Sequence, residues 1–304
     1  MLTGISILCF AACYAIAFGL EVVRLRRRPA WFHIPLAIAT AAGLLAHSLF
    51  LINTGTATSA LPISTADWLL WAAWVLAIVY FATIFYLPRT PTGLALLPIV
   101  FGLILGSKFA SSTPLATEES YYLWGMFHGL ALLLGTVTVS IGFLAGLMYL
   151  IQSYALKHAR SPINRLRLPS LEWLEGVNGR SLGISAVMIA LGFASGLVMA
   201  LATHHGDSQY ALWSDPVVIS LAAMLLWLIA AEVFRLVYPA ARGGRKVAYL
   251  TLASFVFLVI VLASFTLLDT VHGAPRDAII NQQSSHVRVE LLTLDNTGAN
   301  HANG

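Results

Sequence analysis

Histidine side chains recur at one end of the long apolar segments of this chain. His47, His128 and His272 and the adjacent pair His204 and His205 lie at, or just beyond, the same expected membrane face. Neutral imidazole is the commonest metal ligand in proteins, and two opposed imidazoles fill the axial positions of an iron porphyrin. The shared position therefore indicates a metal site, and heme iron fits it best.

Each histidine also has an ordinary structural explanation. A polar ring where an apolar helix meets water commonly serves as an interfacial anchor, and for any one of these residues alone that interpretation is the better one. His47 differs because it is expected about one and a half turns inside its helix, and an ionisable group within a membrane helix usually marks a function. Four further histidines lie at the other face or in the C-terminal tail and are left out of the site: His33, His158, His286 and His301.

The composition identifies the elements that carry these histidines as membrane helices. Of the 304 residues, 59% are hydrophobic and 10% are charged, whereas a soluble domain has about 25% charged residues. Eight apolar segments are expected to be transmembrane helices of an all-α, multi-pass protein in the inner (cytoplasmic) membrane, surrounded by lipid. They are 3–23, 31–52, 66–87, 92–109, 124–151, 181–202, 216–238 and 247–268.

The basic residues set the expected orientation of these segments. Of the 17 lysines and arginines, only Lys108, Arg276 and Arg288 fall on the less basic side. The basic side is expected to be cytoplasmic, which places both termini on the outer (periplasmic) side. The fourth segment is short and contains Pro98, so a tilted, broken or re-entrant segment is the alternative there. The net charge of +4 does not indicate nucleic-acid binding, because the basic residues cluster between apolar segments.

The pattern of polar connections predicts three regions. Residues 1–110 form an N-terminal four-helix membrane segment, residues 120–272 a membrane core, and residues 273–304 a polar outer tail that is expected to be flexible. In the long cytoplasmic connection, residues 169–175 are predicted to form a short amphipathic helix on the membrane surface. Ser170 is its predicted N-cap.

Several residues near the histidines have structural explanations of their own. Asp215, directly before Pro216, fits an ordinary helix N-cap, and Trp213 fits an aromatic belt at the membrane surface. Close helix packing is predicted at two small-xxx-small pairs, Gly142 with Gly146 and Gly192 with Gly196.

Residues 124–272 resemble the cytochrome c assembly family of heme-handling membrane proteins, which includes CcsA-, CcmC- and HemX-like members. The stretch 168–196 is similar to the family segment that leads into a tryptophan-rich loop. The helix that carries His128 resembles the family helix with an external heme-ligating histidine. Residues 213–216, Trp-Ser-Asp-Pro, resemble the end of the family's WxWDP loop, and His272 falls where a second external histidine follows two further helices.

The resemblance implies a heme site and a function. His128 and His272 would ligate heme at the outer face, Trp213 and Asp215 would cradle the porphyrin, and His47 could correspond to a transmembrane heme histidine. The protein would be an assembly factor rather than a conventional enzyme. It would work with membrane-protein partners of cytochrome c maturation and assist heme delivery to an exported apocytochrome.

Other functions stay open. Ser214 stands where the family loop has a tryptophan before the aspartate, which favours a HemX-like accessory or regulatory membrane subunit of a larger complex without heme transfer. A b-type electron-transfer subunit would need histidines at two depths of one helix, which no predicted helix has. A transporter would need charges along a path through the membrane, whereas Glu21 and Glu232 lie near the cytoplasmic helix ends, where they can pair with arginines.

Overall fold

The protein is helical throughout the part of the chain that its computed structural model describes, residues 6–26, 32–58, 64–88, 90–110, 119–157, 168–203, 214–238 and 244–268. In these residues seven helices are long and apolar enough to cross a membrane. The remaining described helix, α4, has 17 residues. It is about 26 Å long, which is somewhat shorter than a hydrocarbon core of about 30 Å. The helices are α1 (Ile7–Arg26), α2 (His33–Thr58), α3 (Thr65–Tyr86), α4 (Gly93–Phe109), α5 (Glu119–Lys157), α6 (Leu171–Thr203), α8 (Pro216–Val237) and α9 (Arg245–Leu267).

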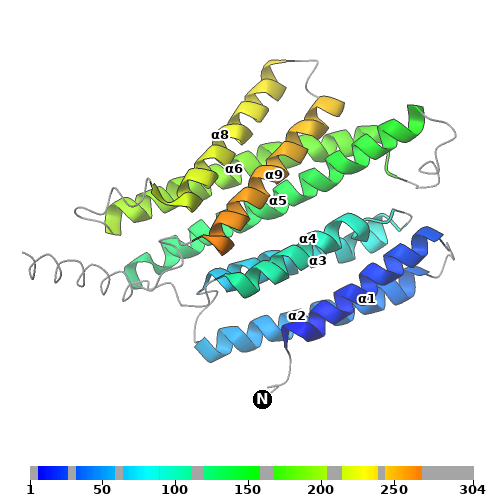
Figure 1. Ribbon diagram of the computed structural model, residues 1–304, viewed down its shortest axis with the longest axis horizontal. Coiled ribbons are helices and arrows are strands. Elements are labelled where there is room, and N and C mark those ends of the chain that lie inside the picture. Colours follow the sequence, from blue (N-terminus) through cyan, green and yellow to red (C-terminus); the bar gives the residue numbers. More distant parts are fainter. Residues whose placement is uncertain are drawn as a thin grey trace, which may run out of the picture.

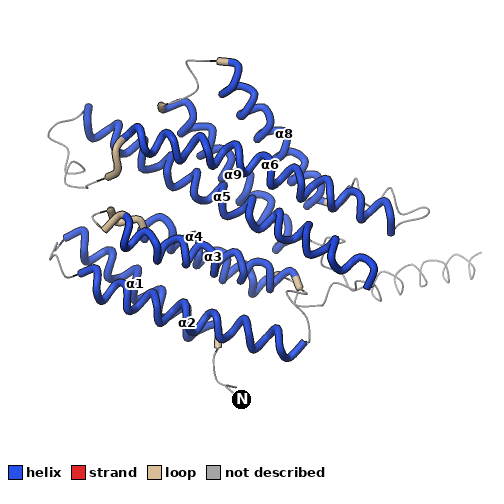
Figure 2. The backbone as a smooth tube through the Cα atoms, turned by 180° about the vertical axis from the view of Figure 1, so that it is seen from behind, coloured by secondary structure: helices blue, strands red, loops and turns tan. Residues whose placement is uncertain are grey.

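These helices form two groups of four that lie side by side (Figures 1 and 2). One group is α1 to α4 and the other is α5, α6, α8 and α9, with α3 and α4 making the contacts to α5 and α9. Consecutive helices run in opposite directions (Figure 1). One end of the molecule therefore carries Arg24, Arg180, Arg235 and Arg245, and we call it the basic end. The assignment of 1–110 and 120–272 as separate domains, and of the basic end as cytoplasmic, stays a prediction.

The second helix continues past its apolar segment. α2 ends at Thr58, although the apolar segment was expected to end at residue 52. The hydroxyl of Thr54 donates to the carbonyl of Phe50 at 2.9 Å, so this polar side chain is satisfied within the helix. His47 consequently lies about three turns from the end of α2. The expected depth of one and a half turns was wrong.

The short surface helix predicted at 169–175 is not a separate element, because α6 runs unbroken from Leu171 to Thr203. Ser170 caps it as predicted: its hydroxyl accepts a hydrogen bond from the backbone N–H of Trp173 at 3.3 Å. Gly176 and Gly179 do not end the helix, since a glycine costs only about 1 kcal/mol there and α6 packs along α5. The amphipathic stretch is therefore the first part of a membrane helix.

Close helix packing is confirmed at the predicted glycine pairs. A Cβ atom added to Gly146 would lie 2.6 Å from the hydroxyl oxygen of Thr251 in α9. A Cβ atom added to Gly192 would lie 2.4 Å from Cδ2 of Leu132 in α5. Because real side chains do not approach so closely, α5 meets α9 and α6 at points where only glycine fits.

Candidate functional site

His128 lies in the third turn of α5 and faces α6. Its Nδ1 atom is 2.7 Å from the carbonyl oxygen of Gly192 and 3.3 Å from the hydroxyl of Ser195. A carbonyl can only accept, so Nδ1 carries the proton and donates it to Gly192. In the neutral ring the lone pair that could bind a metal then belongs to Nε2.

The α6 residues around this ring fix its position. A Cβ atom added to Gly196 would lie 2.7 Å from Cε1 and 3.0 Å from Nδ1 of His128, so the imidazole occupies space that only glycine leaves open. The hydroxyl of Ser195 donates to the same Gly192 carbonyl at 2.8 Å. Trp124, one turn before His128, donates from its indole to the carbonyl of Ser195 at 2.8 Å. Two aromatic rings of α5 are thus held against one short stretch of α6.

The N-terminal group reaches the same region through α3. A Cβ atom added to Gly129 would lie 2.2 Å from Cζ2 of Trp68, so this indole lies against the α5 backbone next to His128. Trp68 is in the first turns of α3, which begins with a capping box. The hydroxyl of Ser64 accepts from the Asp67 backbone N–H at 3.2 Å, and the Asp67 carboxylate accepts from the Ser64 backbone N–H at 3.0 Å. The capped start of α3 therefore positions Trp68 beside the candidate site.

His47 is fully buried between α1 and α2. Its ring stacks on Phe10, with the ring centroids 4.0 Å apart and the planes at 1°, and its Nδ1 lies 3.3 Å from the hydroxyl of Tyr14. Its Nε2 is the only fully buried side-chain nitrogen or oxygen without a hydrogen-bond partner in the described residues. Such an atom costs about 1–3 kcal/mol, so His47 has one nitrogen whose chemistry fits a further ligand.

Asp215 is the N-cap of α8, as the sequence predicts. Its Oδ1 accepts from the backbone N–H of Val217 at 2.7 Å, and Pro216 occupies the first helical position. The side chain is buried. This carboxylate oxygen is committed to the start of α8.

The other predicted site residues lie outside the described part of the chain. They are Trp213 and His272, together with His204 and His205. Within the described residues no three His, Cys, Asp or Glu side chains gather into a metal site. In the sequence these positions follow the last residues of α6 and α9 or precede the first residue of α8. These three helix termini lie opposite the basic end of the molecule, and α5 also begins there (Figure 1). His47 and His128 belong to different groups of four helices.

The contacts that hold His128 were not predicted, although Gly192 and Gly196 were expected to be a site of close helix packing. Trp124 and His128 are four residues apart, and so are Gly192 and Gly196, so each pair shares one face of its helix. That spacing was visible in the sequence. The pairing of the two faces was not, because it depends on how α5 and α6 are aligned along each other.

Comparison with known proteins gives one match. A family model described as "Cytochrome C assembly protein" matches residues 36–272. The match begins within α2 and ends at His272, so it includes the stretch 124–272 that showed the resemblance and extends into the N-terminal group. No curated protein and no solved structure matches the chain.

Proposed function

The chain belongs to the cytochrome c assembly protein family, and from that premise we propose that it handles heme during cytochrome c maturation. Family membership supports a role in cytochrome c maturation, and the apolar helices make the protein a multi-pass membrane protein. The finer proposal is that it binds heme at the outer membrane face and assists its delivery to an exported apocytochrome. Membrane-protein partners of the maturation system would complete this transfer.

One observation carries the proposal, namely the hydrogen bond from Nδ1 of His128 to the carbonyl of Gly192. A histidine that binds a metal almost always donates its other ring N–H to a carbonyl, a carboxylate or a water, which fixes the tautomer and the ring direction. His128 has this arrangement at the end of the bundle where His272 follows α9. The donor set therefore fits a heme ligand.

Each predicted site residue has a distinct part in this proposal. His128 and His272 would hold the heme iron, and Trp213 would offer an aromatic surface to the flat apolar porphyrin. Asp215 would fix the end of the chain segment that follows Trp213 through its cap on α8. His47 is the candidate for a second heme position within the membrane, because its Nε2 is buried without a hydrogen-bond partner in the described residues. Heme would supply the iron, while α6 orients the His128 ring.

An optical spectrum of the purified full-length protein tests the function. After expression with added heme, we expect a bis-histidine heme spectrum in the oxidised and reduced protein, retained through size-exclusion chromatography. A protein that carries no heme even with heme in excess would contradict the proposal. That result would favour an accessory or regulatory subunit, for which the serine at position 214 is the supporting observation.

The close approach of Gly196 to His128 gives a second expected result. Gly196→Ala should weaken heme binding or shift its reduction potential, because the new methyl group would push the imidazole off the Gly192 carbonyl. Overpacking of this kind costs about 1–3 kcal/mol. Gly176→Ala on the same helix is the matched control, since a Cβ atom there meets nothing within 4 Å. Identical heme spectra and potentials for the two variants would show that the position of the His128 ring does not matter to heme.

A further inference from the structure

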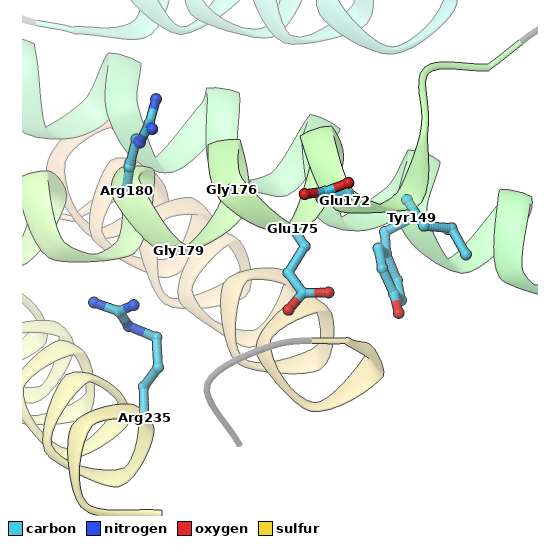
Figure 3. Close-up of a pocket in the computed structure, with 8 residues that line it drawn as sticks. Tyr149, Glu172, Glu175, Gly176, Gly179, Arg180 and Arg235 are labelled. Carbon is cyan, nitrogen blue, oxygen red and sulfur yellow. The ribbon is translucent and has the colours of Figure 1, made fainter. Parts of the chain in front are cut away.

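A groove of about 610 Å³, lined by both charged and small residues, opens between α5, α6 and α8 at the basic end (Figure 3). Its volume falls within the range of about 300–1,000 Å³ that is common for small-molecule sites. Gly176 and Gly179 of α6 line it, and a Cβ atom on Gly176 would meet nothing within 4 Å. The groove exists because α6 presents no side chain at these two positions.

Groups of opposite charge line different parts of this groove. Arg235 donates through Nε and Nη2 to the carboxylate of Glu232, which holds its guanidinium in a fixed direction. Its Nη1 lies 3.2 Å from the position of a Cβ atom on Gly179 and makes no hydrogen bond to any residue that the structure describes. Further along the groove, the Glu175 carboxylate and the Tyr149 hydroxyl point to the same side of α6 as Arg235 (Figure 3).

The groove lies at the level expected for lipid headgroups. Arg235 is in the last turn of α8, so the apolar part of that helix ends here. Trp173, two residues before Glu175, is 47% exposed, and Tyr238, three residues after Arg235, is 57% exposed. Exposed tryptophan and tyrosine beside charged residues are typical of the membrane–water interface. About two turns along α6 from Gly176, Ile184 is exposed and apolar, which places the groove near the end of the apolar surface of this helix.

We propose that this groove binds the phosphoethanolamine headgroup of a membrane phospholipid. The phosphate lies at Nη1 of Arg235, because a guanidinium is well suited to phosphate oxygens. The primary ammonium lies between the Glu175 carboxylate and the Tyr149 hydroxyl, since it has three N–H donors and both groups accept. A headgroup with only negative charge would meet Glu175 unfavourably, and a quaternary choline amine cannot donate a hydrogen bond.

Native mass spectrometry of the full-length protein tests this site. The probes are phosphatidylethanolamine, phosphatidylcholine and phosphatidylglycerol with identical acyl chains. We expect the wild type to retain phosphatidylethanolamine roughly tenfold better than either other lipid, which is the effect of one charge-assisted hydrogen bond. Equal retention of the three lipids would overturn the proposal. Retention of no lipid would also overturn it, and this result is expected if the groove binds a protein segment instead.

Two variants separate the groove from the rest of the lipid-facing surface. Gly176→Leu places a side chain in the groove, with a Cβ atom that meets nothing within 4 Å, and should reduce phosphatidylethanolamine retention to the level of the other lipids. Gly102→Leu is the matched control, because that α4 glycine also has nothing within 4 Å of a Cβ atom and lies in the other group of helices. Equal lipid retention by these two variants, with equal thermal unfolding to show that both are folded, would overturn the site.

Glu175→Gln tests which end of the groove takes the amine. We expect this variant to lose the preference for phosphatidylethanolamine over phosphatidylglycerol, while the heme spectrum stays unchanged. An unchanged preference would show that Glu175 does not bind the amine and would overturn this placement of the headgroup. Because the groove and His128 lie at opposite ends of α6, this result is independent of the heme proposal.

Discussion

Replacement of His128 by alanine is expected to abolish the heme spectrum while the protein still accumulates in the membrane. In the proposed site the bond from His128 to iron would be lost, whereas the helix interface loses one hydrogen bond to Gly192, worth about 1 kcal/mol. The glycine-mediated contact of Gly192 with Leu132 remains in place. Imidazole added to the medium should restore part of the spectrum, because it can enter the vacated coordination position. Difference spectra of membranes and purified protein measure both effects.

The same measurement on other histidines distinguishes a ligand from an anchor. His33→Ala changes an exposed histidine at the basic end of α2 and should leave the heme spectrum unchanged. Replacement of His204 and His205 should also cause no loss, since we regard them as polar groups of the outer loop. A wild-type spectrum in the His128→Ala protein would identify His128 as an interfacial anchor, whose loss costs on the order of 1 kcal/mol or less.

Hydropathy predicts most of this fold because apolar length is set by the membrane. The segments expected at 66–87 and 216–238 correspond closely to α3 (Thr65–Tyr86) and α8 (Pro216–Val237). Besides the end of α2, the errors fall on α5 and α6. These helices have 39 and 33 residues, and they extend past their apolar segments because they pack along each other. Hydropathy detects burial in lipid, and it does not detect a helix that is continued by contact with its neighbour.

The candidate site was predictable to the extent that it depends on local sequence. The cap at Asp215 follows from the adjacent proline, and the pairing of Glu21 with Arg24 and of Glu232 with Arg235 follows from their spacing of three residues. The surroundings of His47 were not predictable, because Phe10 and Tyr14 reach it from another helix. The sequence indicated a polar group inside the membrane, but the contacts that enclose it depend on how α1 and α2 cross.

The buried carboxylate of Glu21 connects three helices of the N-terminal group. Its side chain is 1% exposed and lies 3.3 Å from Nη1 of Arg24, and it accepts from the hydroxyl of Tyr80 in α3 at 3.2 Å. Arg24 also donates to the carbonyl of Pro88, between α3 and α4. A Cβ atom added to Gly93, at the start of α4, would lie 2.8 Å from Cγ of Glu21. The ion pair is therefore enclosed where α1, α3 and α4 meet.

Removal of the Arg24 charge should consequently destabilise the protein strongly. Arg24→Ala leaves a buried carboxylate without its cation, which typically costs about 3–5 kcal/mol. Thermal unfolding in detergent should show a large loss for this variant. Arg180→Ala removes an exposed arginine and should change stability by about 0.5 kcal/mol or less. The double variant Glu21→Gln with Arg24→Ala should regain much of the loss, because no uncompensated charge remains. Equal stability of the Arg24→Ala and Arg180→Ala proteins would show that water, and not Arg24, compensates the Glu21 carboxylate.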